Sequence, residues 1–393
     1  MTQSKKILLG WDLGAGIGYT LQLRDIANSL AKSGHSPTLA LRSIETAHQY
    51  LRDCDFPVLQ APYLIGRLTR SAQRDGFFPT SFTDLMACNG FGSEDHLYSM
   101  LRGWRDLIDL VKPDLIVGRY CPLLTLAAYG RIPVVLFGAG YSTPPVHEDD
   151  FPVLWPEIEP YANSSDVLGV IERVQRRFSS AVPQKLTDAY RGERRVIATL
   201  PQLDPYRSCR IEPCFGPFDP APPPVLAHKK NFYAYFSGAG ELPFKVGDAL
   251  MQSDLQGTVY IRDSNGFEFN GQNPRIQSLT SAPKLSEIVR DSAVVIHHGG
   301  LGTTQAALLA GRPQILLPQV TDQFLSANGL KDECFVAQLS GVENAATIAN
   351  VAEVLMTDKE VQSAAMETAI SLRGEGLHNS KERVLSACLE LLC

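Results

Sequence analysis

Residues 293–330 read A-V-V-I-H-H-G-G-L-G-T-T-Q-A-A-L-L-A-G-R-P-Q-I-L-L-P-Q-V-T-D-Q-F-L-S-A-N-G-L, and they indicate the fold more strongly than any other part of the chain. Residues 294–296 form a short apolar run that is typical of a buried strand. The glycine turn that follows, residues 299–302, has little side-chain bulk to keep a ligand from the backbone. Thr303 and Thr304 then open a predicted helix, whose first N–H groups lack partners and whose dipole favours negative charge. The segment therefore predicts a binding site for a diphosphate.

This stretch resembles the donor-binding signature of nucleotide-sugar-dependent glycosyltransferases with the GT-B fold, of the bacterial macrolide and glycopeptide type. The family signature reads H-x-G-x-G-T/S, then A-L-x-x-G-x-P, then P, then D-Q, and the chain follows it at each step. The resemblance implies that His298 hydrogen-bonds the donor diphosphate. It also implies a phosphate-binding turn and a pair of residues that reads the sugar hydroxyls. The turn comprises Gly299, Gly300, Gly302, Thr303 and Thr304, and the pair is Asp322 and Gln323.

Two histidines compete for the role at the diphosphate. Neighbouring residues of a strand point to opposite faces, so only one of His297 and His298 faces the phosphates. We choose His298 because it directly precedes the glycines. Ser237 and Gly238, just after the expected first strand of the second half, match the family position that supplies another hydrogen-bond donor to the phosphates. An ordinary turn at the end of a strand explains this Ser-Gly pair equally well.

Composition indicates a globular protein of two domains. The chain has 393 residues, of which 44% are hydrophobic and 20% charged. Its net charge of -6, without a basic cluster, argues against nucleic acid as a partner, because binding a phosphate backbone needs a dense positive face. The eight cysteines are scattered without metal-ligand spacing, so we expect reduced thiols and no metal site.

The expected location is the cytoplasm. The apolar run near the start ends at Asp12 without a signal-peptide cleavage site, and no apolar stretch is long enough to cross a bilayer, so membrane contact is limited to a peripheral one. The expected partners are a nucleotide sugar, which is a co-substrate rather than a cofactor, and a small-molecule or lipid-like acceptor. The sequence says nothing about the oligomeric state.

Strands alternate with amphipathic helices in both halves, which predicts an α/β protein with two doubly wound parallel sheets. The proline-rich segment 213–224 cannot form helix or central strand, and we interpret it as an interdomain linker. We therefore expect two Rossmann-like domains facing a cleft, residues 1–215 and 216–377. The resemblance implies that the first domain holds the acceptor and the second the donor. The resemblance implies that a last helix, within residues 378–393, crosses back to the first domain.

The expected catalytic base is missing from its family position. The family has a glycine loop ending in histidine after the first strand, and that histidine takes the acceptor proton. Here the loop ends in Tyr19, which is harder to deprotonate than histidine at neutral pH by about 4 to 5 kcal/mol. Asp12, at the end of the first strand, is the best alternative base, although it also suits a loop cap, and the 147–149 loop comes next. An acidic acceptor that needs no base, or a protein that binds a nucleotide sugar without transferring it, are the other hypotheses.

The implied reaction is displacement at the anomeric carbon, inverting and independent of metal. The D-x-D string at residues 53–55 lacks a strand that would place it in a donor site, which argues against a metal there. Ala306 stands where many relatives that use uridine diphosphate sugars carry a ribose-binding glutamate, so we expect a uridine or deoxythymidine diphosphate sugar and favour the latter. A silent homologue that binds a nucleotide sugar or assists a partner enzyme, and a sugar-nucleotide epimerase, are the competing hypotheses.

Overall fold

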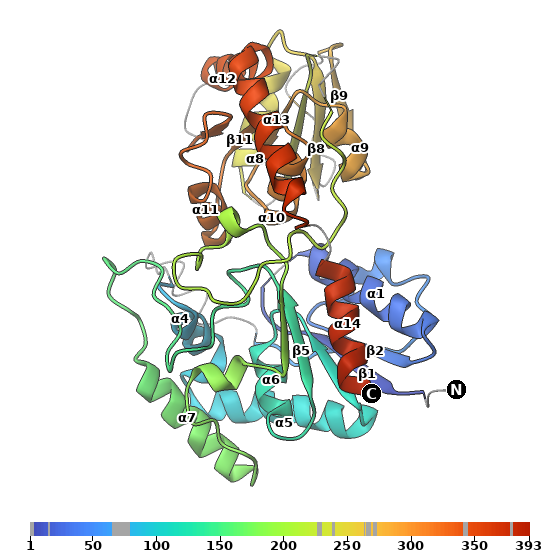
Figure 1. The fold of residues 1–393 in the computed structure, drawn as a ribbon, viewed down its shortest axis with the longest axis vertical. Coiled ribbons are helices and arrows are strands. Elements are labelled where there is room, and N and C mark those ends of the chain that lie inside the picture. The colour runs from blue at the N-terminus through green and yellow to red at the C-terminus, as the bar shows by residue number, and fades with distance from the viewer. Residues whose placement is uncertain are drawn as a thin grey trace. The chain divides into compact units, whose positions relative to one another are not determined.

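The structure is a computed structural model that describes residues 4–14, 16–64, 79–225, 230–237, 240–262, 264, 269, 273–340, 345–377 and 380–393. The chain divides into two compact units. Unit 1 comprises Met1–Ala198, Tyr206–Cys214 and Ser380–Cys393, and unit 2 comprises Thr199–Pro205 and Phe215–Asn379. Each unit contains a six-stranded sheet in which all pairs of strands are parallel (Figure 1).

The sheet of unit 1 has the strand order β3-β2-β1-β4-β5-β6. Its strands are β1 (Lys6–Trp11), β2 (Ser36–Leu41), β3 (Val58–Gln60), β4 (Leu115–Gly118), β5 (Val134–Gly138) and β6 (Arg194–Ile197). Its helices are α1 (Ile17–Lys32), α2 (Ile44–Ala47), α4 (Phe82–Met86), α5 (Glu94–Val111), α6 (Pro122–Ala128), α7 (Ser164–Arg177) and α14 (Ser380–Leu392). The strand order reverses between β1 and β4, and the carboxyl ends of such strands are where ligands of open α/β sheets bind.

Helix α5 shows how the sequence builds the core of unit 1. Its buried residues Leu97, Leu101, Trp104 and Ile108 recur every three or four positions and so form one apolar stripe. This stripe packs in one cluster with residues of β1, β4, α6 and α7. The opposite layer holds α1 and α14, which lie side by side (Figure 1). Both faces of the sheet are therefore covered.

The sheet of unit 2 has the strand order β12-β11-β10-β7-β8-β9. Its strands are β7 (Phe232–Ser237), β8 (Gly257–Arg262), β9 (Ile276–Leu279), β10 (Val294–His297), β11 (Gln314–Leu316) and β12 (Val336–Gln338). Its helices are α8 (Leu242–Met251), α9 (Leu285–Arg290), α10 (Leu301–Leu309), α11 (Thr321–Asn328), α12 (Ala345–Thr357) and α13 (Lys359–Gly374). Residues of α8 and α12 cover one face, and residues of α9 and α10 cover the other. The order reverses between β7 and β10, so these two strand ends flank the expected ligand position.

Two segments belong to a unit other than their neighbours in sequence. Helix α14 is part of unit 1, where Lys381 pairs with Asp25 at 2.6 Å. The short segment Thr199–Pro205 is part of unit 2, because Leu200 and Leu203 pack in one cluster with residues of α10 and α13. The domain boundary predicted after residue 215 does not account for the segment Thr199–Pro205, which belongs to unit 2.

The prediction of two doubly wound parallel sheets is confirmed. All of the strands except β3, β9 and β12 overlap short apolar runs of the sequence, such as residues 294–296. The pattern did not reveal β3, β9 and β12, which are three or four residues long and lie at or next to sheet edges. Periodicity over so few residues cannot separate a strand from a loop. Within the described ranges, no helix is long and apolar enough to cross a membrane.

Gly257 tests the packing between β7 and β8. A Cβ atom at this position would lie 2.5 Å from both the carbonyl oxygen and a ring carbon of Phe232, a strand partner that cannot move away. We expect Gly257→Ala to lower the free energy of unfolding by about 1 to 3 kcal/mol, as overpacked cores do. Gly374→Ala is the matched control, because an added Cβ meets nothing within 4 Å there. Thermal midpoints measured by calorimetry should fall for the first variant alone; equal midpoints would contradict the steric argument.

Candidate functional site

The turn between β10 and α10 leaves an open space in front of the first turn of the helix. Gly299 has a φ of +81°, a conformation that side chains other than glycine's rarely adopt. A Cβ on Gly300 would lie 2.9 Å from Nε2 of His298, whereas a Cβ on Gly302 would meet nothing within 4 Å. No side chain caps α10. The unpaired N–H groups at its start therefore face space that a small anion can fill.

His297 has a structural role. It is fully buried, its Nε2 lies 2.9 Å from Oε1 of Gln314, and its Nδ1 accepts the N–H of Gly299 at 3.1 Å. These contacts fix a neutral ring with the proton on Nε2. The pKa of His297 is lowered to about 3, first by burial and then by the charge of His298, while the hydrogen bond to Gln314 opposes both effects. The ring thus pins the glycine turn to the neighbouring strand β11.

His298 has the features of a ligand-binding group. It is 9% exposed, and its buried Nδ1 has no hydrogen-bond partner. The ring packs at an angle against Tyr235 at 5.3 Å and Phe236 at 6.4 Å. Burial first, and then the charge of Arg262, lower the pKa of His298 to about 4, while a backbone hydrogen bond to Tyr235 opposes them. At neutral pH the ring is uncharged and has an unused nitrogen beside the glycine turn.

Arg262 lies near His298, and the sequence analysis does not mention it. It is the last residue of β8 and lies opposite Ser237, the last residue of β7, in the sheet register. Its guanidinium is close enough to His298 to lower the pKa of that imidazole. The alternation along β8 indicates which residues share a face with Arg262, but the pairing of β8 with β7 is not visible in the sequence. Gly238 lies outside the described residues.

The two threonines of α10 differ in what they can offer a ligand. The Thr304 hydroxyl donates to the carbonyl of Gly300 at 3.0 Å, so this O–H is used within the helix rather than directed at a phosphate. Thr303 is 6% exposed and precedes it. The next side chain, Gln305, accepts the N–H of Leu200 at 2.9 Å and so ties α10 to the Thr199–Pro205 segment. Both threonines stay predicted donors, and the Thr304 hydroxyl would have to give up its bond to Gly300 in order to reach a phosphate.

Asp322 and Gln323 lie next to the glycine turn, in the first turn of α11. The carbonyl oxygen of Gln323 would lie 3.3 Å from a Cβ on Gly299. Oε1 of Gln323 accepts the N–H of Gln319 at 2.8 Å, which holds the start of α11 to the end of the β11 loop. Asp322 is exposed as a residue. Desolvation of its carboxyl group raises its pKa, and the N–H groups of Asp322 and Gln323 oppose that shift. The structure therefore brings the predicted pair and the predicted turn together.

Asp12 caps a helix at the switch point of unit 1. It follows β1, is 1% exposed, and its Oδ2 accepts the N–H of Leu124 in the first turn of α6 at 2.9 Å. Its Oδ1 is buried without a hydrogen-bond partner. Burial raises the pKa of Asp12 to about 8, against the lowering effects of the Leu124 and Leu123 N–H groups and the charge of Arg42. A carboxyl group with such a pKa can exchange a proton near neutral pH.

Tyr19, in the first turn of α1, is part of an aromatic stack. Its ring lies 5.0 Å from Trp11 and 6.2 Å from Tyr120, and the guanidinium of Arg119 lies 4.9 Å from its centroid. Tyr120 has a φ of +49°, an uncommon conformation for an aromatic residue. Such strained residues cluster at functional sites. Tyr19 therefore stacks on Trp11, the residue that precedes Asp12. Its contacts are packing contacts, and none of them favours loss of the phenol proton.

A buried ionic bridge fixes the loop after β5, which includes the 147–149 residues. The carboxylate of Glu212 accepts a hydrogen bond from Arg195 at 2.9 Å and another from Arg210 at 3.1 Å. The guanidinium of Arg210 also donates to the carbonyls of Gly140 and Thr143. Further along, Asp149 is exposed and paired with Lys185 at 2.5 Å. The carboxylates of this loop therefore lack the burial that makes Asp12 a candidate base.

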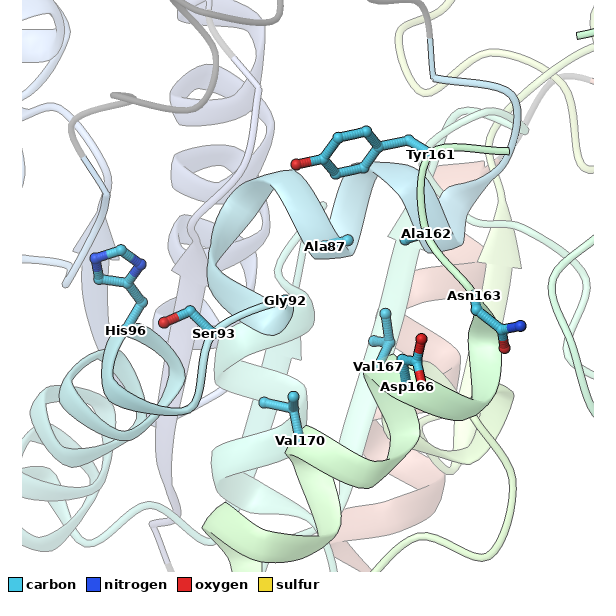
Figure 2. A pocket seen from close by; sticks show the side chains of 10 residues that line it. All are labelled: Ala87, Gly92, Ser93, His96, Tyr161, Ala162, Asn163, Asp166, Val167 and Val170. Carbon is cyan, nitrogen blue, oxygen red and sulfur yellow. The ribbon is translucent and has the colours of Figure 1, made fainter. Parts of the chain in front are cut away.

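A cavity of about 370 Å³ lies elsewhere in unit 1, where α5 and α7 begin (Figure 2). Ser93 and His96 line one side of it, and Asn163 and Asp166 line another. Asn163 already caps α7 by accepting the N–H of Ser165 at 2.9 Å. No residue predicted to bind the donor or to act as base lines this cavity, within the described part of the chain.

Sequence comparison finds partial matches to known proteins. Residues 273–388 match the family model of the erythromycin biosynthesis protein CIII-like C-terminal domain. The elloramycin glycosyltransferase of Streptomyces olivaceus is 34% identical over 100 residues, which are 25% of each protein. The vancomycin aglycone glucosyltransferase of Amycolatopsis orientalis is 71% identical over 31 residues, 8% of each. The chain thus matches a quarter or less of the length of these curated relatives.

Structural comparison covers nearly the whole chain. The calicheamicin glycosyltransferase superposes with a TM-score of 0.72 at 16% identity, covering 99% of both chains. The glycosyltransferase VinC, solved with dTDP, gives 0.68 at 14% identity and covers 98% of this chain and 99% of that one. The spinosyn rhamnosyltransferase SpnG, solved with spinosyn aglycone, gives 0.68 at 15% with the same coverage. The fold is therefore of the GT-B type, and the resemblance to macrolide and glycopeptide glycosyltransferases is confirmed.

The raised pKa of Asp12 predicts a pH dependence of stability. The folded carboxyl keeps its proton up to about pH 8, whereas the unfolded one loses it near 3.8. Stability therefore falls as pH rises between these values, by up to about 1.4 kcal/mol per pH unit. Asp12→Asn removes this titration, so the variant should gain relative to the parent protein as pH rises from 5 to 8 in urea denaturation. A difference between the two proteins that does not change with pH would contradict the burial of an unpaired Oδ1.

Proposed function

We propose that this protein is a glycosyltransferase that moves a sugar from a nucleoside diphosphate sugar, preferably a deoxythymidine diphosphate sugar, to an acceptor hydroxyl. The observation that carries the proposal is the uncapped start of α10 beside the unpartnered Nδ1 of His298, at the strand end where the sheet order reverses. The family model that matches residues 273–388 and the partial matches of the chain to curated glycosyltransferases support the same interpretation.

The donor diphosphate binds at the β10–α10 turn. Gly302 leaves room for a phosphate against the backbone, and the helix start supplies N–H groups and a positive dipole end. Nδ1 of His298 is the ring nitrogen without a partner, and it donates one hydrogen bond to a phosphate when the neutral ring carries its proton on Nδ1. Asp322 and Gln323 meet the sugar. Deoxythymidine is favoured because Ala306 offers no carboxylate to a ribose 2′-hydroxyl, and because VinC and SpnG have both been solved with thymidine diphosphate.

The transfer is a single displacement that inverts the anomeric carbon. The acceptor oxygen forms a bond to that carbon while the bond to the diphosphate oxygen breaks, and the electron pair leaves with the nucleotide. His298 and the N–H groups of α10 stabilise the charge that develops on the departing phosphate. Oδ1 of Asp12 takes the proton that the acceptor hydroxyl loses when the Asp12 carboxyl group is ionised, which becomes its main form above about pH 8.

A second candidate, a homologue that binds a nucleotide sugar without transferring it, is favoured by one observation. Asp12 is 1% exposed and one of its oxygens caps α6, so its carboxyl group is engaged in holding the fold. Both candidate proteins bind the donor, so binding cannot separate them. Turnover of the donor can, because only the glycosyltransferase transfers the sugar.

A panel of nucleotide sugars tests the proposal directly. We expect dTDP-glucose or a related dTDP sugar to raise the thermal midpoint, and we expect its slow hydrolysis or its transfer to a phenolic acceptor in chromatographic assays. By calorimetry, dTDP should bind more tightly than UDP. Binding without any turnover would favour the silent homologue, release of an epimerised sugar nucleotide would favour an epimerase, and no binding by any member of the panel would refute the proposal.

Substitution of His298 tests the phosphate site. We expect His298→Ala to weaken dTDP binding by about 10- to 100-fold, the value of a hydrogen bond to a charged group. His297→Ala is not a suitable comparison, since that ring holds the turn itself. His35→Ala, in unit 1, is the matched control and should leave the dissociation constant unchanged. An unchanged constant for His298→Ala would remove this histidine from the site.

The base is tested by comparing two variants at the end of β1. Asp12→Asn should lower turnover of the donor at least 100-fold with little effect on dTDP binding, since general bases contribute about 10²- to 10⁴-fold. Tyr19→Phe should stay within a few-fold of the parent protein, because its ring packing is retained. Equal and undiminished rates would exclude both residues from the chemistry.

A further inference from the structure

The proposed donor carries negative charge that the predicted site residues do not neutralise. A nucleoside diphosphate sugar has two negative charges at neutral pH, and His298, whose pKa is about 4, carries none. The start of α10 contributes the equivalent of about half a positive charge. A buried anion needs more compensation than this, because desolvation of an unpaired charge is costly.

Arg262 supplies a full positive charge at this edge of the sheet. Among the described residues at the carboxyl ends of β7, β8, β10 and β11, it is the only lysine or arginine. The arginines nearest in sequence have other positions: Arg275 precedes β9 and pairs with Asp254, and Arg290 follows α9 and pairs with Asp291. Both lie on the side where the strands begin.

The position of Arg262 in the sheet directs it toward the β10–α10 turn. Within β8, Thr258, Tyr260 and Arg262 are half-buried and alternate with buried residues, so they share one face. The register pairs Tyr260 with Tyr235 and Arg262 with Ser237. Since β7 lies between β8 and β10, Arg262 and His298 are separated by the width of this one strand.

An aromatic row fills the space between these groups. The rings of Tyr235 and Tyr260 stack at 5.9 Å with an angle of 7° between their planes, and His298 lies against Tyr235 at 5.3 Å. Tyr260 shares a face of β8 with Arg262, and Nε of Arg262 is buried, so part of the guanidinium is shielded from water. The attraction between Arg262 and an anion is therefore less screened than at an open surface.

We propose that Arg262 is a further donor-binding residue, whose guanidinium neutralises the donor diphosphate while His298 contributes only a hydrogen bond. The inference rests on the proposed function, because it assigns a charge partner to the same ligand. Three properties follow from it. Donor affinity depends on ionic strength through Arg262, it changes little with pH through His298, and binding of the uncharged nucleoside does not depend on Arg262.

Calorimetric titration with dTDP-glucose and with thymidine tests the inference. Arg262→Gln should weaken dTDP-glucose binding about 10-fold or more and flatten its dependence on salt between 50 and 300 mM, with thymidine affinity unchanged. Arg262→Lys should retain the salt dependence and recover part of the affinity, because a charge remains without the planar fork. Arg290→Gln, the same change at the other edge of the sheet, is the matched control and should behave as the parent protein.

The outcomes separate this inference from the proposed function. If the parent protein binds dTDP-glucose and Arg262→Gln binds it with the same affinity and salt dependence, the inference is wrong and the glycosyltransferase proposal stands. If the parent protein binds no nucleotide sugar, the proposed function itself fails. Equal losses of thymidine and dTDP-glucose affinity in Arg262→Gln would also overturn the inference, since they would indicate a disturbed fold; thermal midpoints of the four proteins check that point.

Discussion

The candidate site in unit 2 depends on how the start of α10 is held. An exposed helix start frays unless its preceding turn is fixed, and here a neutral, buried His297 accepts the N–H of Gly299 while its other nitrogen contacts Gln314 on β11. Burying the imidazole of His297 is unfavourable because the ring loses its contacts with water. Its two hydrogen bonds offset this free energy only while the ring is uncharged. The turn can therefore present bare N–H groups to a ligand without a side-chain cap.

The two sites share one architectural rule. In each unit, the strand that comes first in the sequence lies beside the strand where the order reverses, so β1 and β7 end at switch points. Asp12 follows β1, and Ser237 ends β7. The chemistry at the two points differs, because unit 1 offers a buried carboxyl group and an aromatic stack, whereas unit 2 offers N–H groups, an imidazole and a guanidinium.

Sequence patterns predicted much of this, for reasons that particular residues make clear. The run 294–296 and the glycines could be placed because buried strands and glycine turns have local signatures, whereas Asp322 could be placed only by the resemblance to the family signature. Arg262 could not be placed, because its role depends on β8 being paired with β7, which no local pattern reveals. The bond from Thr304 back to Gly300 and the cap that Asp12 provides to α6, which follows it by more than 100 residues in the chain, likewise depend on tertiary contacts.

Helix α14 has a consequence for the order of assembly during synthesis on the ribosome. This helix comes after all of unit 2 in the chain, yet it covers α1, β4, β5 and β6 of unit 1. One layer of unit 1 therefore stays incomplete, with apolar surface open to water, until unit 2 has emerged and can fold. Contacts between segments so distant in sequence slow folding, so a nascent chain halted before Ser380 is exposed to aggregation and to holding by chaperones.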